Sequence, residues 1–298
     1  MRIIVLGSAA GGGFPQWNCR CPVCRLAWAG DKRVTPRTQS GLAVSADGER
    51  WILLNASPDL RQQILATPAL HPKTGLRHSP IAAVILTNGE LDHIAGLLTL
   101  RERQAFRLYA TETTHASVRS NDLFRALDEK LVERCPMQPG EPLDLPGLRF
   151  VPFVVPGKVP LYQESGDVAL GEETEHVLGL EIIADGQRCL YVPNCARITP
   201  ELRERLAGAD LLFFDGTTFT DDEMVRHGLS PKTAARMGHL AMDGPDGSIA
   251  GLAGLPLGRR VFLHLNNSNP ALVEGSAERL QVAAAGWELA HDGMEFTL

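Results

Sequence analysis

The sequence predicts an α/β protein in which two β-sheets pack together and helices cover their outer faces. Strand-like segments outnumber helical ones, and helices separate the strands in both halves of the chain. The two kinds of segment do not alternate strictly, as they would in one doubly wound sheet. With 298 residues, 44% of them apolar, the chain is long enough to bury a large core in one large domain or two small ones.

The first half of the chain carries clear strand and turn signals. The fully apolar run 81–87 indicates a strand buried on both faces. Asp47-Gly48 marks a hairpin turn. A helix is predicted from Ser57-Pro58-Asp59 to about Leu65, because Pro suits the first helical position behind a Ser cap. The other predicted elements here are strands at 2–6, 41–46, 51–56 and 107–110, and helical segments at 94–100 and 113–131.

The second half is richer in strands. Asp185-Gly186 predicts a hairpin turn between two of them. Strands are predicted at 148–155, 179–184, 189–193, 211–215, 261–265 and 288–298, and helices at 200–206 and 270–284.

Composition excludes several classes of protein. The 29 basic and 35 acidic residues give a net charge of -6, and no Lys/Arg run exceeds a dipeptide, so no nucleic-acid partner is expected. No run approaches the roughly 18 to 20 apolar residues of a membrane span, which predicts no membrane insertion. The apolar run Ile3–Leu6 is too short for the core of a signal peptide, and we expect a cytoplasmic protein.

Three cysteines, Cys19, Cys21 and Cys24, lie within six residues of one another. In a reducing cytoplasm, such a cluster favours a metal site over disulfides. Thiolates suit a structural zinc ion, which takes four ligands and so needs a fourth from elsewhere. The alternative is a group of buried or redox-labile thiols.

Acidic and histidine side chains follow several predicted strands. Asp92-His93 comes after the strand 81–87, and Asp215 and His264 end or follow later strands. His239 follows a glycine. Each alone suits an ordinary role, such as a helix-capping Asp or a hydrogen-bonded core His. Together, at strand ends where ligand sites collect, they favour a metal centre.

The segment Leu86–Gly96 resembles the signature of the metallo-β-lactamase superfamily, Leu-Thr-His-x-His-x-Asp-His-x-x-Gly. Asn88 and Glu90 replace two of its histidines. Further similar motifs follow in family order at 191–194, 215–217, 238–239 and 263–264, and the pattern is similar to the tRNase Z and cyclic phosphodiesterase branch. The resemblance implies an αββα four-layer sandwich, formed by a single domain of residues 1–298 with a zinc loop at 19–24.

Longer segments at 7–19, 57–61 and 264–270 resemble the B-protein family of pyrroloquinoline quinone (PQQ) biosynthesis. This resemblance implies a role in making coenzyme PQQ from a peptide-derived Glu-Tyr cross-link. Other PQQ biosynthesis proteins as partners, and a homodimer, stay open. Where the cyclic phosphodiesterase branch carries a His, this chain has Asn267, so Asn267 or a nearby polar group is predicted as the fourth ligand of the cysteine zinc.

The departures from the superfamily pattern decide the predicted chemistry. Asn88, Glu90 and the absence of a His near 155–157 remove one half of a dinuclear zinc centre, and Asn194 stands where the pattern has a bridging Asp. The resemblance leaves a second half, which is predicted to hold one metal through Asp92, His93 and His264, with Asp215, Glu90 and Asn194 as further candidates.

One carboxylate and two imidazoles suit iron(II) and dioxygen as well as zinc. We therefore predict an iron-dependent oxygenase with Asp92 and His239 as catalytic residues. The resemblance to the PQQ biosynthesis family implies that it hydroxylates the tyrosine-derived ring of the precursor. His239 is expected beside the metal, as a proton donor or hydrogen-bond partner. Two alternatives remain: a carrier that aids transport of PQQ or its precursor to the periplasm, and a mononuclear-zinc hydrolase.

Overall fold

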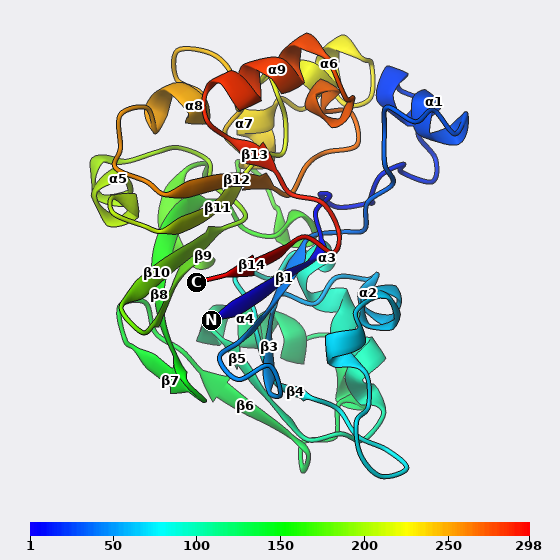
Figure 1. Ribbon diagram of the computed structural model, residues 1–298, viewed down its shortest axis with the longest axis vertical. Helices are drawn as coiled ribbons and strands as arrows, with labels where there is room; N and C mark the ends of the chain where they lie inside the picture. Colours follow the sequence, from blue (N-terminus) through cyan, green and yellow to red (C-terminus); the bar gives the residue numbers. More distant parts are fainter.

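The computed structural model describes residues 1–298 and contains two seven-stranded mixed sheets that lie face to face (Figure 1). The first sheet has the order β14-β1-β2-β3-β4-β5-β6, and the second β13-β12-β11-β10-β9-β8-β7. The first comprises β1 (Arg2–Gly7), β2 (Gly41–Ser45), β3 (Trp51–Leu54), β4 (Ile81–Ile85), β5 (Phe106–Ala110), β6 (Val132–Pro136) and β14 (Glu295–Thr297). The second comprises β7 (Leu143–Leu145), β8 (Leu148–Gly157), β9 (Glu172–Ala184), β10 (Gln187–Val192), β11 (Leu211–Asp215), β12 (Arg259–Leu263) and β13 (Glu288–Leu289).

Helices cover the outer face of each sheet, as Figure 1 shows for α5 to α9 above the second sheet. The α-helices are α1 (Pro22–Trp28), α2 (Leu60–Ala66), α3 (Leu91–Ile94), α4 (Glu112–Arg119), α5 (Pro200–Leu206), α6 (Glu223–Arg226), α7 (Ala234–Met237), α8 (Ser248–Gly251) and α9 (Ala277–Ala284). Short 3-10 helices are η1 (Pro68–Leu70), η2 (Ala95–Arg101), η3 (Asp122–Ala126), η4 (Leu161–Gln163) and η5 (Pro270–Leu272). None of the helices combines the length and hydropathy needed to cross a lipid bilayer.

The apolar core is divided into three layers by the two sheets. In β11, which is buried along its whole length, Phe213 faces the space between the sheets and packs edge to face on Phe296 of β14. Its neighbour Phe214 faces the outer helices and contacts Trp287. Because successive strand residues point to opposite faces, a strand buried on both faces must be apolar throughout. The predicted αββα sandwich is confirmed.

Most predicted elements agree with the structure to within a few residues. Helix α5 has the predicted bounds, because the Thr199 hydroxyl accepts a hydrogen bond from Leu202 N and Pro200 occupies the first turn. The helix predicted from Ser57-Pro58-Asp59 begins instead at Leu60. Ser57 does not cap it, since its hydroxyl donates to the Gln63 side chain.

The prediction was wrong at three longer segments. The helix predicted at 113–131 ends at Arg119, where Asn121 caps the separate η3, and residues 127–131 are not helical. The strand predicted at 288–298 is two strands in different sheets, β13 and β14, separated by a turn. The helix predicted at 270–284 is interrupted between η5 and α9.

Strands β6 and β7 were not predicted, and β9 begins seven residues before its predicted start. β6 and β7 lie at the edges of the two sheets. An edge strand has one neighbour and more exposed side chains, so its sequence carries little apolar periodicity.

Candidate metal centre

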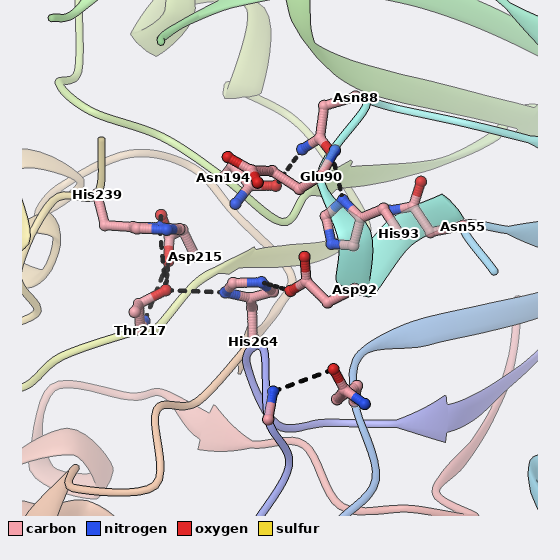
Figure 2. A network of polar contacts seen from close by, with 12 residues as sticks. Asn55, Asn88, Glu90, Asp92, His93, Asn194, Asp215, Thr217, His239 and His264 are labelled. Atoms are coloured by element: carbon pink, nitrogen blue, oxygen red, sulfur yellow. Dashed lines mark hydrogen bonds and ion pairs between the residues drawn. The ribbon is translucent and has the colours of Figure 1, made fainter. Parts of the chain in front are cut away.

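The side chains singled out from the sequence gather where β4, β10, β11 and β12 end. They line a cleft of about 390 Å³, with Asp92, Asn194, His239 and His264 among its walls. Figure 2 shows these residues pointing toward one another from segments far apart in the sequence. The ends of β10, β11 and β12 meet because these strands run parallel.

Asp92, His93 and His264 are placed to share one cation. Their ligand atoms lie within 4.8 Å of one another, and Nε2 of His264 is 3.0 Å from Oδ2 of Asp92. Asp92 and His93 lie on the short helix α3, and His264 directly follows β12. His264 has a φ of 60°, a left-handed conformation that costs a non-glycine residue about 1 kcal/mol or more and often marks a functional site.

His93 leaves one ring nitrogen for a cation. Its Nδ1 donates to Oδ1 of Asn88 at 2.8 Å, since that oxygen only accepts. Its Nε2 is buried and has no hydrogen-bond partner. Burial lowers the pKa of His93 to about 4, although the nearby Asp92 charge opposes this, so the ring is neutral at physiological pH. A buried, unprotonated nitrogen without a partner fits a metal ligand.

Thr217 orients the His264 ring in the same way, with Nδ1 as the donating nitrogen and Nε2 directed at the cleft. The Thr217 hydroxyl donates to Asp215 at 2.6 Å and therefore accepts from Nδ1 of His264 at 2.9 Å. Nε2 then faces the Asp92 carboxylate, where either a proton or a metal must lie between the two groups. Burial alone would lower the pKa of His264, but the hydrogen bond and charge of Asp92 raise it overall. The pKa of Asp92 is lowered, because the nearby His93, which is charged in the acidic range where Asp92 titrates, and the hydrogen bond and charge of His264 outweigh the effect of burial.

Asp215 holds neighbouring residues of the site in place through hydrogen bonds. Its fully buried carboxylate accepts hydrogen bonds from the backbone of Cys195 and Thr217, the Thr217 hydroxyl and Nδ1 of His239, the last at 2.7 Å. These contacts occupy both oxygens. His239 stacks on His264 with ring centroids 5.2 Å apart and lines the cleft. The structure thus places His239 beside the three grouped residues, with its ring held by Asp215.

Asn88, Glu90 and Asn194 are engaged by other protein groups. Nδ2 of Asn88 donates to Oδ1 of Asn194 at 2.8 Å (Figure 2). The Glu90 carboxylate accepts from the Leu161 backbone at 3.0 Å and from Nζ of Lys158 at 3.3 Å. These contacts occupy the Asn88 amide, the Glu90 carboxylate and the Asn194 side-chain oxygen with protein groups.

The cysteine cluster forms a second candidate site around the start of α1. The three sulfurs of Cys19, Cys21 and Cys24 are buried and lie within 4.8 Å of one another. The Asn267 amide lies 3.1 Å from the Cys19 sulfur, 3.3 Å from that of Cys24 and 3.9 Å from that of Cys21. The structure therefore brings Asn267 to the position predicted for a fourth ligand. A hydrogen bond from Cys21 lowers the pKa of Cys24.

Sequence reasoning missed several residues of the cleft. Lys158, Ser230, Lys232 and Asn266 line it, yet they come from loops and irregular segments. Lone Ser, Lys and Asn residues carry no periodic or spacing signal. The strand-end position of Asn266, two residues after His264, is the one available hint.

Comparisons with known proteins show the family to which the chain belongs. A family model described as "Beta-lactamase superfamily domain" matches residues 50–265, which include Asp92, His93, His239 and His264 but not the cysteine cluster. A protein of Methylobacterium nodulans called coenzyme PQQ synthesis protein B is 60% identical, with each chain covered completely. A protein of the same name from Xanthomonas oryzae is 54% identical, again over the whole of both chains.

Among solved structures, that of Zn(2+)-bound PqqB from Methylobacterium extorquens is 57% identical over the whole of both chains, with a TM-score of 0.99. A diphosphatase of the PhnP family, at 24% identity and a TM-score of 0.70, shares the fold. The chain belongs to the β-lactamase superfamily and, within it, to the coenzyme PQQ synthesis protein B family. A role in PQQ biosynthesis, predicted from the sequence, is thereby confirmed.

Proposed function

We propose that this protein hydroxylates the tyrosine-derived ring of the Glu-Tyr peptide precursor of PQQ, with one iron(II) ion held by Asp92, His93 and His264. The observation that carries the proposal is the hydrogen bond between Asn88 and Asn194. A dinuclear hydrolase needs two metals to hold a hydroxide between them. Here the positions for the second metal are occupied by neutral amides bound to each other, which supports a mononuclear centre.

The donor set suits the proposed chemistry. Two imidazoles and one carboxylate leave coordination positions open, an arrangement typical of iron(II) oxygenases. Bound iron would supply binding and activation of dioxygen. The net reaction inserts one oxygen atom into a ring C–H bond and reduces the other to water, using two electrons and two protons from an external reductant. The unpartnered Nε2 of His93 supports a bound cation at this place.

His239 is proposed to act as the proton donor or acceptor for the phenolic oxygen of the substrate. Since Asp215 and Thr217 hold its Nδ1, its Nε2 is the atom left to exchange a proton with, or hydrogen-bond to, the phenolic oxygen of the substrate. Asp92 serves as the anionic ligand. We propose that zinc binds Cys19, Cys21 and Cys24, with an oxygen of Asn267 closing the site, since its backbone carbonyl lies 3.6 Å from the Cys21 sulfur and 3.7 Å from that of Cys24.

A second candidate is a mononuclear-zinc hydrolase, because one carboxylate and two imidazoles also suit zinc. Dioxygen uptake with the cross-linked precursor distinguishes the two. Iron-loaded protein is expected to consume dioxygen and to add one oxygen atom to the precursor, as measured by mass spectrometry, while zinc-loaded protein does neither. Cleavage of the precursor by zinc-loaded protein without dioxygen would support the hydrolase. Precursor binding without turnover under either metal would support the carrier.

A further inference from the structure

A row of alternating charges extends along the cleft from Glu90. Nζ of Lys158 lies 3.3 Å from Oε1 of Glu90 and 3.0 Å from Oε1 of Glu164. Arg236 and Lys232 approach the other oxygen of Glu164, at 3.0 Å and 3.6 Å. The row thus contains three cations and two carboxylates, which leaves a local excess of positive charge.

Two of the three cations are not placed to bind a ligand in the cleft. Lys158 is almost completely buried, and its ammonium group has three acceptors, the third being the Val159 carbonyl at 3.1 Å. An ammonium group has three hydrogens to donate, so Lys158 has none left. Arg236 directs two nitrogens at the Glu164 carboxylate and is not among the residues that line the cleft. Neither side chain therefore offers a free donor to a ligand in the cleft.

Lys232 is the exception. It lines the cleft, its side chain is 33% exposed, and its 3.6 Å contact with Glu164 is too long for a hydrogen bond. Its three N–H groups therefore lack a protein acceptor. Ser230, also in the wall of the cleft, accepts a hydrogen bond from the Lys232 backbone at 3.1 Å, and its hydroxyl hydrogen has no protein partner. Ammonium and hydroxyl donors thus lie together on the loop that precedes α7.

We propose that Lys232 and Ser230 bind a carboxylate of the substrate while its ring lies against the metal residues. An ammonium group with an adjacent hydroxyl donor is suited to an anion, and the contact with a carboxylate is strong where water is partly excluded. The proposal deepens the proposed function, because it rests on a carboxylate-bearing PQQ precursor as the substrate. It makes Lys232 a specificity-determining residue of the cleft.

The test uses the full-length, zinc-loaded protein and PQQ, a tricarboxylate, as the probe. Binding is measured by calorimetric titration for the wild type, Lys232→Met, Ser230→Ala and the matched control Lys130→Met, whose exposed lysine makes no ion pair. Lys232→Met is expected to weaken PQQ binding on the order of tenfold, Ser230→Ala less, and the control not at all. Zinc content and thermal stability confirm folding of each variant.

The trimethyl ester of PQQ lacks the carboxylate charges. It therefore distinguishes a loss of electrostatic attraction in Lys232→Met from a change in the packing of the cleft. The wild type and Lys232→Met should bind the ester equally. The proposal would be overturned by unchanged PQQ affinity in Lys232→Met, by an equal loss for the ester, or by a wild type that does not bind PQQ. Dioxygen uptake is measured separately, so that an inactive protein with Lys232-dependent PQQ binding would contradict the hydroxylation and leave the carboxylate site intact.

Discussion

The side-chain amides of Asn88 and Asn194 are joined by a hydrogen bond of 2.8 Å, although the residues are 106 positions apart and follow strands of different sheets. In the superfamily pattern that the sequence resembles, these two positions hold a histidine ligand and a bridging aspartate. The amide pair takes over their place and orients His93 through Oδ1 of Asn88. Asn88 thus replaces a histidine ligand of the superfamily pattern and orients a second predicted ligand, His93.

Replacing His93 by Ala should abolish metal binding in the cleft and leave the cysteine zinc in place. His93 supplies a buried nitrogen with no other partner, and the two remaining side chains, Asp92 and His264, then pair with each other. Metal content per chain, measured by mass spectrometry, should fall by one ion. His291→Ala, which removes an exposed ring, serves as the control. Two tightly bound ions in the wild-type cleft would contradict a mononuclear centre.

His239→Ala and His264→Ala should differ after iron loading. His239→Ala is expected to keep most of its iron and to lose turnover by roughly 100-fold or more, in line with the loss of a general acid or base. His264→Ala should lose both iron and turnover. Equal loss of iron in the two variants would make His239 a ligand, which its position within the second group of Asp215, His239 and His264 would then explain. Full turnover by His239→Ala would assign it a structural role.

Cys21→Ser should release the zinc ion that we propose at the cysteine cluster and loosen the loop that leads into α1. Cys21 both caps this helix, by accepting from Cys24 N, and lies among the clustered sulfurs. Because metal binding contributes directly to folding, we expect a loss of roughly 2 kcal/mol or more, which lowers Tm by about 4 °C in a domain of this size. Calorimetry measures the change. Cys135→Ser, which lies outside the cluster, should leave Tm unchanged.

Glu223 should make the protein less stable as the pH rises. Burial raises its pKa to about 7 from the ordinary 4.5, and Ser268 and the Phe219 backbone hold its oxygens. The folded state therefore binds more protons than the unfolded state between these values. The contribution of Glu223 to the free energy of unfolding is fully present below pH 4.5. It is lost as the pH rises toward 7, at about 1.4 kcal/mol per pH unit and roughly 3 kcal/mol in all.

Glu223→Gln tests this assignment, because the amide copies the protonated carboxyl without its titration. The variant should be more stable than the wild type at pH 8 and about equal to it at pH 4, as measured by urea unfolding. A constant difference between the two proteins across this range would show that Glu223 stays charged when folded. Glu141→Gln at an exposed position provides the control.

The sequence alone determined the fold class and the first set of candidate ligands. Uninterrupted apolar runs such as 81–85 and 211–214 are buried on both faces because a central strand has no polar side, so they can be recognised locally. His264 follows such a strand directly and Asp92 comes seven residues after one, which brought both into the prediction. The edge strands β6 and β7 were not predicted, because their strand conformation depends on pairing with neighbouring strands in the sheet.

Tertiary structure alone decided the roles within the site. Three features depend on side chains from distant segments: Asp215 holds His239, Asn88 pairs with Asn194, and the Lys232 ammonium group is left without a hydrogen bond. Hydrogen bonds and ion pairs between such segments act over a few ångströms in space and leave no periodic trace along the chain. Residue type and spacing can therefore nominate a ligand, whereas its protonation and its remaining partners are fixed only by the fold.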